Sequence, residues 1–293
     1  MFRGTYTALV TPFRDDQIDF AAFEKLIESQ IAGGITGIIP VGTTGESPTL
    51  SHEEKEQLIR AAVEIARGGC QVLAGTGSNA TRAAICATLA AEKLGVDGAL
   101  VVAPYYNKPS QEGLFRHFQA IARESTLRIM LYNIPARSGV DVGPETVERL
   151  ARECSNIVCI KEASGSVDRV AELRGRLPNK FTILSGDDGL TLPFMAVGAV
   201  GVVSVASNLL PTEVSALVRA FASGDIAGAQ QLHRRMAGLF KDLFIEPNPV
   251  PVKTALAWRG LMSSEVRLPL CAMSDANEAR LRKTLETFER ASV

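Results

Sequence analysis

Eight short runs of β-branched and apolar residues recur along the chain, and most are followed by a segment whose apolar residues stand three and four positions apart. Phe20, Phe23 and Ile27, between the first two runs, show this helical spacing. Runs that are hydrophobic throughout, without alternation, are typical of strands covered on both faces. Eight successive strand–helix units predict an α/β fold, a closed (β/α)8 or TIM barrel. The runs begin at Thr5, Thr36, Gln71, Gly98, Arg128, Ile157, Phe181 and Val200.

A doubly wound open sheet is the alternative fold, but it usually carries a GxGxxG turn after its first strand. Here the first run ends in Val10-Thr11-Pro12-Phe13, which favours the barrel. After the eighth run the pattern is helical without a further strand. We therefore predict a barrel over residues 1–224 and a helical C-terminal region over 225–293. Within that region, three prolines two residues apart predict an extended segment over residues 246–253.

Charge and cysteine usage narrow the class of partner and the compartment. The chain has 31 Lys and Arg against 32 Asp and Glu, a net charge of −1, so we predict no nucleic-acid or membrane partner and expect small-molecule substrates. Five cysteines without a CxxC pair favour buried thiols in a reducing compartment. Because no leader or long apolar segment is recognisable, we expect a cytoplasmic protein.

Lys161 is the residue that most narrows the reaction class. It follows Val158-Cys159-Ile160 in the sixth run, and a lysine inside a buried strand is energetically costly. One interpretation is a structural ion pair, which Glu162 cannot supply because adjacent strand residues point to opposite faces. The other is a desolvated amine at the barrel mouth, with a lowered pKa and therefore nucleophilic, able to form a Schiff base.

Hydroxyl groups at other strand ends offer the proton transfers that Schiff-base chemistry needs. Tyr106 and Tyr132 follow the fourth and fifth runs, and Thr43 and Thr44 follow the second. Strand ends converge at the carboxyl face of a barrel, so these groups can form a proton relay. The alternative is that the tyrosines only pack their rings and make local hydrogen bonds.

Two features suggest carboxylate binding. Thr43-Thr44-Gly45 offers consecutive backbone N–H groups in a glycine-containing turn. Arg137 follows the fifth strand and can present its guanidinium to a second carboxylate, or it can be a solvated surface residue. Asp187-Asp188 lacks a nearby histidine, and a helix N-cap explains it more simply than a metal site, so we predict no metal.

Six longer motifs stand at or near the strand ends. They are Gly42-Thr43-Thr44-Gly45-Glu46-Ser47, the stretch from Pro104 to Gly113, Leu131-Tyr132-Asn133-Ile134-Pro135, Ile160-Lys161-Glu162-Ala163, Leu184-Ser185-Gly186-Asp187-Asp188 and Glu246-Pro247-Asn248-Pro249. Over nearly the whole chain the sequence resembles the dihydrodipicolinate synthases of the pyruvate-dependent lyase family, which also contains N-acetylneuraminate lyase.

The resemblance implies specific roles for these residues. Lys161 would form the Schiff base with pyruvate, and Tyr132 would donate and accept protons. Thr43 and Tyr106 would complete the relay. Thr44 and Val203 would line the pyruvate site, and Arg137 would bind the carboxylate of aspartate semialdehyde. Gly186 is a further substrate-binding residue that the resemblance implies. No cofactor is expected beyond the covalent imine.

The resemblance also implies an assembly. In the family, the tyrosine that matches Tyr106 crosses a tight dimer interface into the neighbouring active site. We therefore expect a homo-oligomer, a tetramer built as a dimer of tight dimers.

A regulatory cleft is a further implication. Lysine-inhibited members bind lysine at positions that match Ser47, Pro48, His52, Lys55, Asn79, Ala83 and Tyr105 here. Lys55 stands where a histidine is common, and Ala83 where an acidic residue would hold the lysine amino group. Both differences disfavour a cationic ligand, so we predict weak or absent inhibition by lysine.

The expected activity is the condensation of pyruvate with L-aspartate 4-semialdehyde in the diaminopimelate route to lysine, the reaction of a class I aldolase-type lyase. One alternative is a lyase for another 2-keto acid, such as N-acetylneuraminate or a keto-deoxy sugar acid. Arg137 and the Thr43-Thr44 pair argue against it. Another alternative is a non-catalytic relative that binds a keto acid, which the intact set of Lys161, Tyr132, Tyr106 and Thr43 disfavours.

Overall fold

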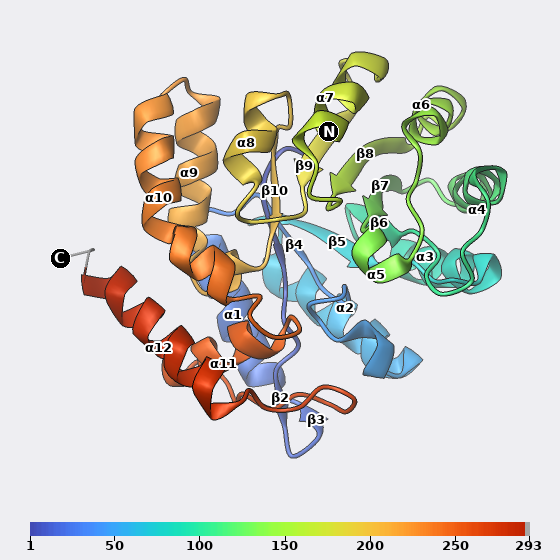
Figure 1. The fold of residues 1–293 in the computed structure, drawn as a ribbon. Coiled ribbons are helices and arrows are strands. Elements are labelled where there is room, and N and C mark those ends of the chain that lie inside the picture. The colour runs from blue at the N-terminus through green and yellow to red at the C-terminus, as the bar shows by residue number, and fades with distance from the viewer. Residues whose placement is uncertain (291–293) are drawn as a thin grey trace.

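The computed structural model describes residues 1–290 and confirms the predicted barrel (Figure 1). Eight parallel strands close in the order β1-β10-β9-β8-β7-β6-β5-β4, so sequence neighbours pair all the way round. The strands are β1 (Gly4–Ala8), β4 (Gly37–Ile39), β5 (Gln71–Gly75), β6 (Gly98–Val102), β7 (Arg128–Asn133), β8 (Ile157–Glu162), β9 (Thr182–Ser185) and β10 (Gly201–Ser204).

Helices surround the strands because the strands are apolar on both faces. The outer helices are α1 (Phe20–Ala32), α2 (His52–Ala66), α3 (Thr81–Lys93), α4 (Gln111–Glu124), α6 (Pro144–Glu153), α7 (Val167–Arg176), α8 (Thr191–Ala196) and α9 (Pro211–Ala222). Short helical turns follow three strands: η1 (Ser47–Thr49), α5 (Pro135–Ser138) and η2 (Ala206–Asn208). These turns lie at the carboxyl ends of the strands, where barrel enzymes place their active sites.

The barrel interior is a compact apolar cluster that supports the site. It comprises Phe2, Tyr6, Ala8, Ile39, Leu73, Leu100, Met130, Tyr132, Cys159, Leu184 and Val203. In the strand register Tyr132 is opposite Lys161, and Lys161 is opposite Leu184. Residues in register on neighbouring strands point to the same face, so Lys161 shares the inward face with Tyr132 and Leu184.

The C-terminal region is helical, as predicted, and packs beside the barrel in Figure 1. It contains α10 (Ile226–Asp242), α11 (Val250–Trp258) and α12 (Asp275–Arg290). The boundary that we predict at residue 224 falls in the turn between α9 and α10 and stays a prediction. The last three residues of the predicted region, 291–293, lie outside the described residues.

The prediction of an extended segment over residues 246–253 is wrong in its second half. Helix α11 begins at Val250, and Pro251 occupies its first turn. A proline is tolerated there because its missing N–H would have no partner within the helix. A small antiparallel hairpin that we do not predict from the sequence, β2 (Phe13–Arg14) and β3 (Gln17–Ile18), lies between β1 and α1. Among residues 1–290, no helix has the length and apolarity that a membrane span requires.

Candidate active site

Lys161 lies buried at the carboxyl end of β8, with 5% of its surface exposed. Burial lowers its pKa to about 7; the carboxylate of Asp188 opposes this shift, and the charge of Arg137 adds to it. No salt bridge to Lys161 is formed within residues 1–290, so the structure does not support the ion-pair interpretation. An amine with a pKa near 7 is neutral in a large share of molecules at neutral pH, and the neutral amine can attack a carbonyl carbon.

Glu162, next in the strand, is bound separately from Lys161. It is fully buried, accepts a hydrogen bond from Arg169 Nε at 2.8 Å and interacts with Asn133 Nδ2 at 3.1 Å. The side chains of Lys161 and Glu162 therefore point to opposite faces of the strand, as predicted. Lys161 is therefore free of the nearest carboxylate in the sequence.

Tyr132 on β7 lies directly beside the amine. The Nζ atom of Lys161 is 4.1 Å from the centroid of the Tyr132 ring. Burial raises the pKa of Tyr132 to about 12, while the charge of Arg137 and a hydrogen bond with Thr43 oppose the rise. The phenol is therefore protonated at neutral pH and can give a proton to a group formed at Lys161 and take it back.

Gly186, at the end of β9, lies beside the lysine, and Val203 lies in the barrel interior on β10. A Cβ atom at Gly186 would lie 2.6 Å from Ala163 Cβ and 3.1 Å from Lys161 Cε, so a larger residue would collide with the lysine stem or its neighbour. Val203 on β10 is 1% exposed within the barrel interior. The glycine thus leaves space for the stem of Lys161.

The turn after β4 carries the predicted carboxylate cradle, but with one N–H group fewer than predicted. The N–H of Gly45 donates to Gly42 O at 3.1 Å, so it is used inside the turn. The N–H groups of Thr43 and Thr44 have no acceptor in the described part of the chain. Val41, with φ of 60°, adopts a left-handed conformation that β-branched residues rarely take, and such strain gathers at functional sites.

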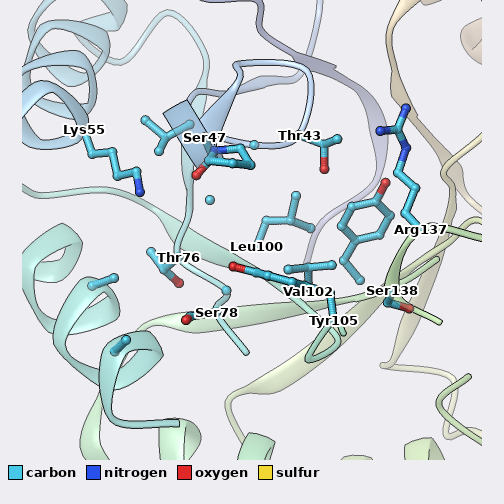
Figure 2. Close-up of a pocket in the computed structure, with 18 of the residues that line it drawn as sticks. Thr43, Ser47, Lys55, Thr76, Ser78, Leu100, Val102, Tyr105, Arg137 and Ser138 are labelled. Carbon is cyan, nitrogen blue, oxygen red and sulfur yellow. The ribbon is translucent and has the colours of Figure 1, made fainter. Parts of the chain in front are cut away.

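A pocket of about 340 Å³ opens above these residues (Figure 2). Thr43, Tyr132 and Arg137 line one part of it, and in Figure 2 Thr43 and Arg137 lie on the side opposite Lys55. Lys161 and Thr44 are not among its lining residues, although Tyr132, which is as buried as Lys161, is one of them. Arg137, in α5, is exposed at the pocket, where its guanidinium is accessible to a carboxylate.

The positions of the predicted regulatory cleft belong largely to the same pocket. Ser47, Pro48, His52, Lys55, Ala83 and Tyr105 line it, whereas Asn79 does not. No Asp or Glu is among its lining residues within 1–290, and burial lowers the pKa of Lys55. The cleft as described contains no carboxylate for a cationic ligand.

Tyr106 is the one predicted catalytic residue that the single chain does not bring to the site. Its side chain is 88% exposed, and its φ of 75° is unusual for a residue with a bulky side chain. Its backbone is held, since the N–H of Tyr106 donates to Ser138 O at 3.2 Å. The loop thus projects the phenol away from its own chain.

Asp188 does not cap the helix that follows it; its neighbour Asp187 accepts the N–H groups of Gly189 and Leu190 at 2.8 and 3.3 Å in the turn that leads into α8. Asp188 is 1% exposed, and its Oδ2 atom accepts the N–H groups of Val205 and Ala206 at 3.0 and 2.9 Å. The carboxylate therefore joins the ends of β9 and β10 and contributes negative charge near Lys161. Among residues 1–290, no group of three His, Cys, Asp or Glu side chains is arranged to hold a metal ion.

One contact at the site was missed by the sequence analysis. The Nδ2 atom of Asn248, from the loop between α10 and α11, donates to Thr44 Oγ1 at 3.0 Å. The only sequence signal for it is that Asn248 stands in the proline-flanked motif at residues 246–249. A contact across 204 positions cannot be read from local patterns.

A closed parallel barrel with a buried lysine of lowered pKa beside a protonated tyrosine has the groups that a lyase working through a Schiff base requires. The model of the dihydrodipicolinate synthetase family matches residues 1–288, and the chain belongs to that family.

Full-length relatives agree with this assignment. The 4-hydroxy-tetrahydrodipicolinate synthase of Endomicrobium trichonymphae is 50% identical over 288 residues, covering 98% of this chain and 99% of the relative. The solved structure of the same enzyme from Methylacidiphilum fumariolicum SolV is 58% identical, with a TM-score of 0.98, and covers 99% of this chain and 97% of that one. A pyruvate complex of the chloride-inhibited dihydrodipicolinate synthase from Acinetobacter baumannii is 42% identical, with a TM-score of 0.96 and 99% coverage of both chains.

Proposed function

We propose that this chain is a lyase that condenses pyruvate with L-aspartate 4-semialdehyde through an imine on Lys161. The observation that carries the proposal is the burial of Lys161, which brings its pKa to about 7, beside the phenol of Tyr132. The full-length relatives are 4-hydroxy-tetrahydrodipicolinate synthases, and a relative of known structure holds pyruvate. Both findings support the same substrate for this site.

The reaction uses the site residues in sequence. The neutral Lys161 amine adds to the keto carbon of pyruvate, and the carbonyl oxygen leaves as water after protonation through Tyr132. Loss of a methyl proton from the imine to Tyr132 gives an enamine, whose carbon attacks the aldehyde carbon while the aldehyde oxygen takes up a proton. The amino group of the semialdehyde then adds to the imine carbon and displaces the Lys161 amine, which closes the ring and frees the lysine. The Thr43 and Thr44 N–H groups bind the pyruvate carboxylate, and Arg137 binds the carboxylate of the semialdehyde.

The choice of acceptor tests this proposal against the other lyases. We expect turnover of pyruvate with L-aspartate 4-semialdehyde, followed through a coupled reductase, and none with N-acetylmannosamine. Activity with the sugar alone would contradict the acceptor assignment while leaving the imine chemistry in place. A chain inactive with both acceptors would fit a keto-acid-binding protein without catalysis.

Assembly is the second part of the proposal, because Tyr106 projects from its own chain. We propose a tetramer of tight dimers in which each Tyr106 completes the relay of Thr43 and Tyr132 in the other subunit. An exposed, backbone-anchored phenol on a strained loop supports a role in an interface.

Tyr106→Phe is expected to reduce kcat by roughly 10²-fold with little change in the KM for pyruvate, because the relay loses one proton carrier. The oligomer should be unchanged when its mass is measured by light scattering. Mixing Tyr106→Phe with inactive Lys161→Met subunits provides the control. If Tyr106 acts across an interface, heterodimers regain one functional site; activity that never rises after subunit exchange would contradict the arrangement.

Regulation by lysine is expected to be weak. The pocket offers Lys55 and His52, with no carboxylate among its described lining residues, so a second ammonium group would be repelled. Millimolar lysine should leave turnover nearly unchanged, whereas the double substitution Lys55→His and Ala83→Glu should make the enzyme more sensitive. Tight inhibition of the wild type at low lysine concentration would contradict the prediction.

A cytoplasmic location stays a prediction. The five free cysteines are in keeping with a reducing compartment.

A further inference from the structure

The C-terminal region reaches the active site at Thr44. Asn248 is 6% exposed, Thr44 is 3% exposed, and their side chains are joined by the 3.0 Å hydrogen bond from Asn248 Nδ2 to Thr44 Oγ1. The Oδ1 atom of Asn248 is buried without a donor in the described structure. Thr44 is therefore the one hydrogen-bond partner that residues 1–290 give to this amide.

A buried ion pair fixes the same turn a few residues further on. Lys253 Nζ, fully buried at the start of α11, lies 2.7 Å from Glu46 Oε1 and donates to Thr11 O at 2.9 Å. The second carboxylate oxygen of Glu46 accepts the N–H of Arg267 at 3.0 Å. The C-terminal region thus holds the turn of residues 42–47 at two points, one of which is the Thr44 hydroxyl.

The direction of the Asn248–Thr44 bond determines where the Thr44 proton can go. A threonine hydroxyl donates one hydrogen bond and accepts up to two. Because Asn248 donates to it, Thr44 keeps its own proton for another acceptor, and no residue among 1–290 accepts it. The N–H groups of Thr43 and Thr44 are unpaired in the same turn, so three donors are available there.

We infer that Asn248 is a positioning residue for the keto-acid substrate: its amide orients the Thr44 hydroxyl so that Thr44 donates to the substrate carboxylate. This inference rests on the proposed function, since it needs pyruvate bound at the turn of residues 42–47. It makes the C-terminal region part of the active site. Asn248 acts on Thr44 across 204 positions of the chain. The C-terminal region then contributes to substrate binding as well as packing against the barrel.

The test measures pyruvate binding without the second substrate. The initial rate of borohydride trapping is followed at increasing pyruvate concentration, which gives a half-saturating concentration and a maximal rate. Asn248→Ala should raise the half-saturating concentration by roughly tenfold, the effect of one lost hydrogen bond to a charged group, with a nearly unchanged maximal rate. Asn248→Asp keeps the shape of the side chain, but its ionised carboxylate can only accept hydrogen bonds. It should therefore accept the Thr44 proton, and the variant should bind pyruvate at least as weakly as Asn248→Ala.

A double-mutant cycle separates this role from a structural one. In a Thr44→Val background there is no hydroxyl to orient, so Asn248→Ala should cause no further rise in half-saturating pyruvate. Asn277→Ala is the matched control: its amide bonds Glu246 Oε1 at 2.8 Å in the same C-terminal region but does not contact Thr44. This variant should trap pyruvate like the wild type.

The outcomes distinguish the two proposals. An unchanged half-saturating concentration in a folded Asn248→Ala or Asn248→Asp enzyme would overturn the positioning role. The same increase with and without the Thr44 hydroxyl would overturn it as well. If the wild type itself trapped no pyruvate, the proposed function would fail, and this inference with it. If Asn248→Ala does not fold, the half-saturating pyruvate concentration of Asn248→Asp, which keeps the shape of the side chain, tests the positioning role. It is then measured with and without Thr44→Val.

Discussion

Replacing Lys161 with methionine is expected to lower kcat/KM by at least about 10⁴-fold, because no other group can form the covalent intermediate. Methionine fills a similar volume without an amine, so the barrel interior should stay packed. Burial already disfavours the charged form of this lysine, as its lowered pKa shows, and Lys161 makes no salt bridge within residues 1–290. We therefore expect the melting temperature to be retained or raised.

The measurement is the coupled assay beside a thermal unfolding scan of the same preparation. Lys253→Met is an instructive comparison, because it removes the other deeply buried lysine. That variant leaves Glu46 buried without its partner and should lose stability, since breaking a buried ion pair is strongly destabilising. A Lys161→Met enzyme that turns over within tenfold of the wild type would contradict the mechanism.

Tyr132→Phe is expected to show the second largest effect, a loss of roughly 10²–10⁴-fold in kcat, the usual contribution of a general acid and base. The ring is kept, so its packing 4.1 Å from the lysine amine should be preserved. Only the proton carrier between the substrate and Thr43 is removed. The amine should still react with pyruvate, but slowly, because water leaves without assistance.

Single-turnover trapping with pyruvate checks this result. We expect slow imine formation in Tyr132→Phe with a nearly unchanged final amount of adduct. Thr43→Val should produce a smaller loss in the same direction, because Tyr132 then keeps its proton but loses its partner. Equal rates of imine formation in the wild type and Tyr132→Phe would assign the proton transfer to another group.

The fold could be predicted from sequence because its signals are local. Eight continuous hydrophobic runs specify strands that are covered on both faces, and the order of units specifies the barrel. The burial of Lys161 could likewise be predicted, because it extends an apolar run. The resemblance correctly identified the family, which the family model and full-length relatives confirm. The residue roles remain predictions that the geometry supports.

What could not be predicted depends on contacts between distant segments. Asn248 and Thr44 meet across the fold, and Asp188 uses N–H groups that only appear once β10 is placed beside β9. Three prolines two residues apart predict an extended segment through residue 253, but Pro251 lies in the first turn of α11, where a proline is tolerated. The outward direction of Tyr106 follows from a left-handed backbone conformation that its residue type does not favour. In each case the tertiary structure determines the contact or the conformation, and local sequence propensity does not.

The most direct test of the account is to treat the wild type with pyruvate and borohydride and to identify the modified lysine by peptide mass. We expect a single adduct on Lys161 and none on Lys253, whose amine is held by Glu46 and the Thr11 carbonyl. The trapping rate should be half-maximal near pH 7, because the pKa of Lys161 is lowered to about 7 and the neutral form is the nucleophile. It should fall about tenfold per pH unit below that value and level off above it. An unmodified Lys161, or an adduct on another lysine, would contradict the account.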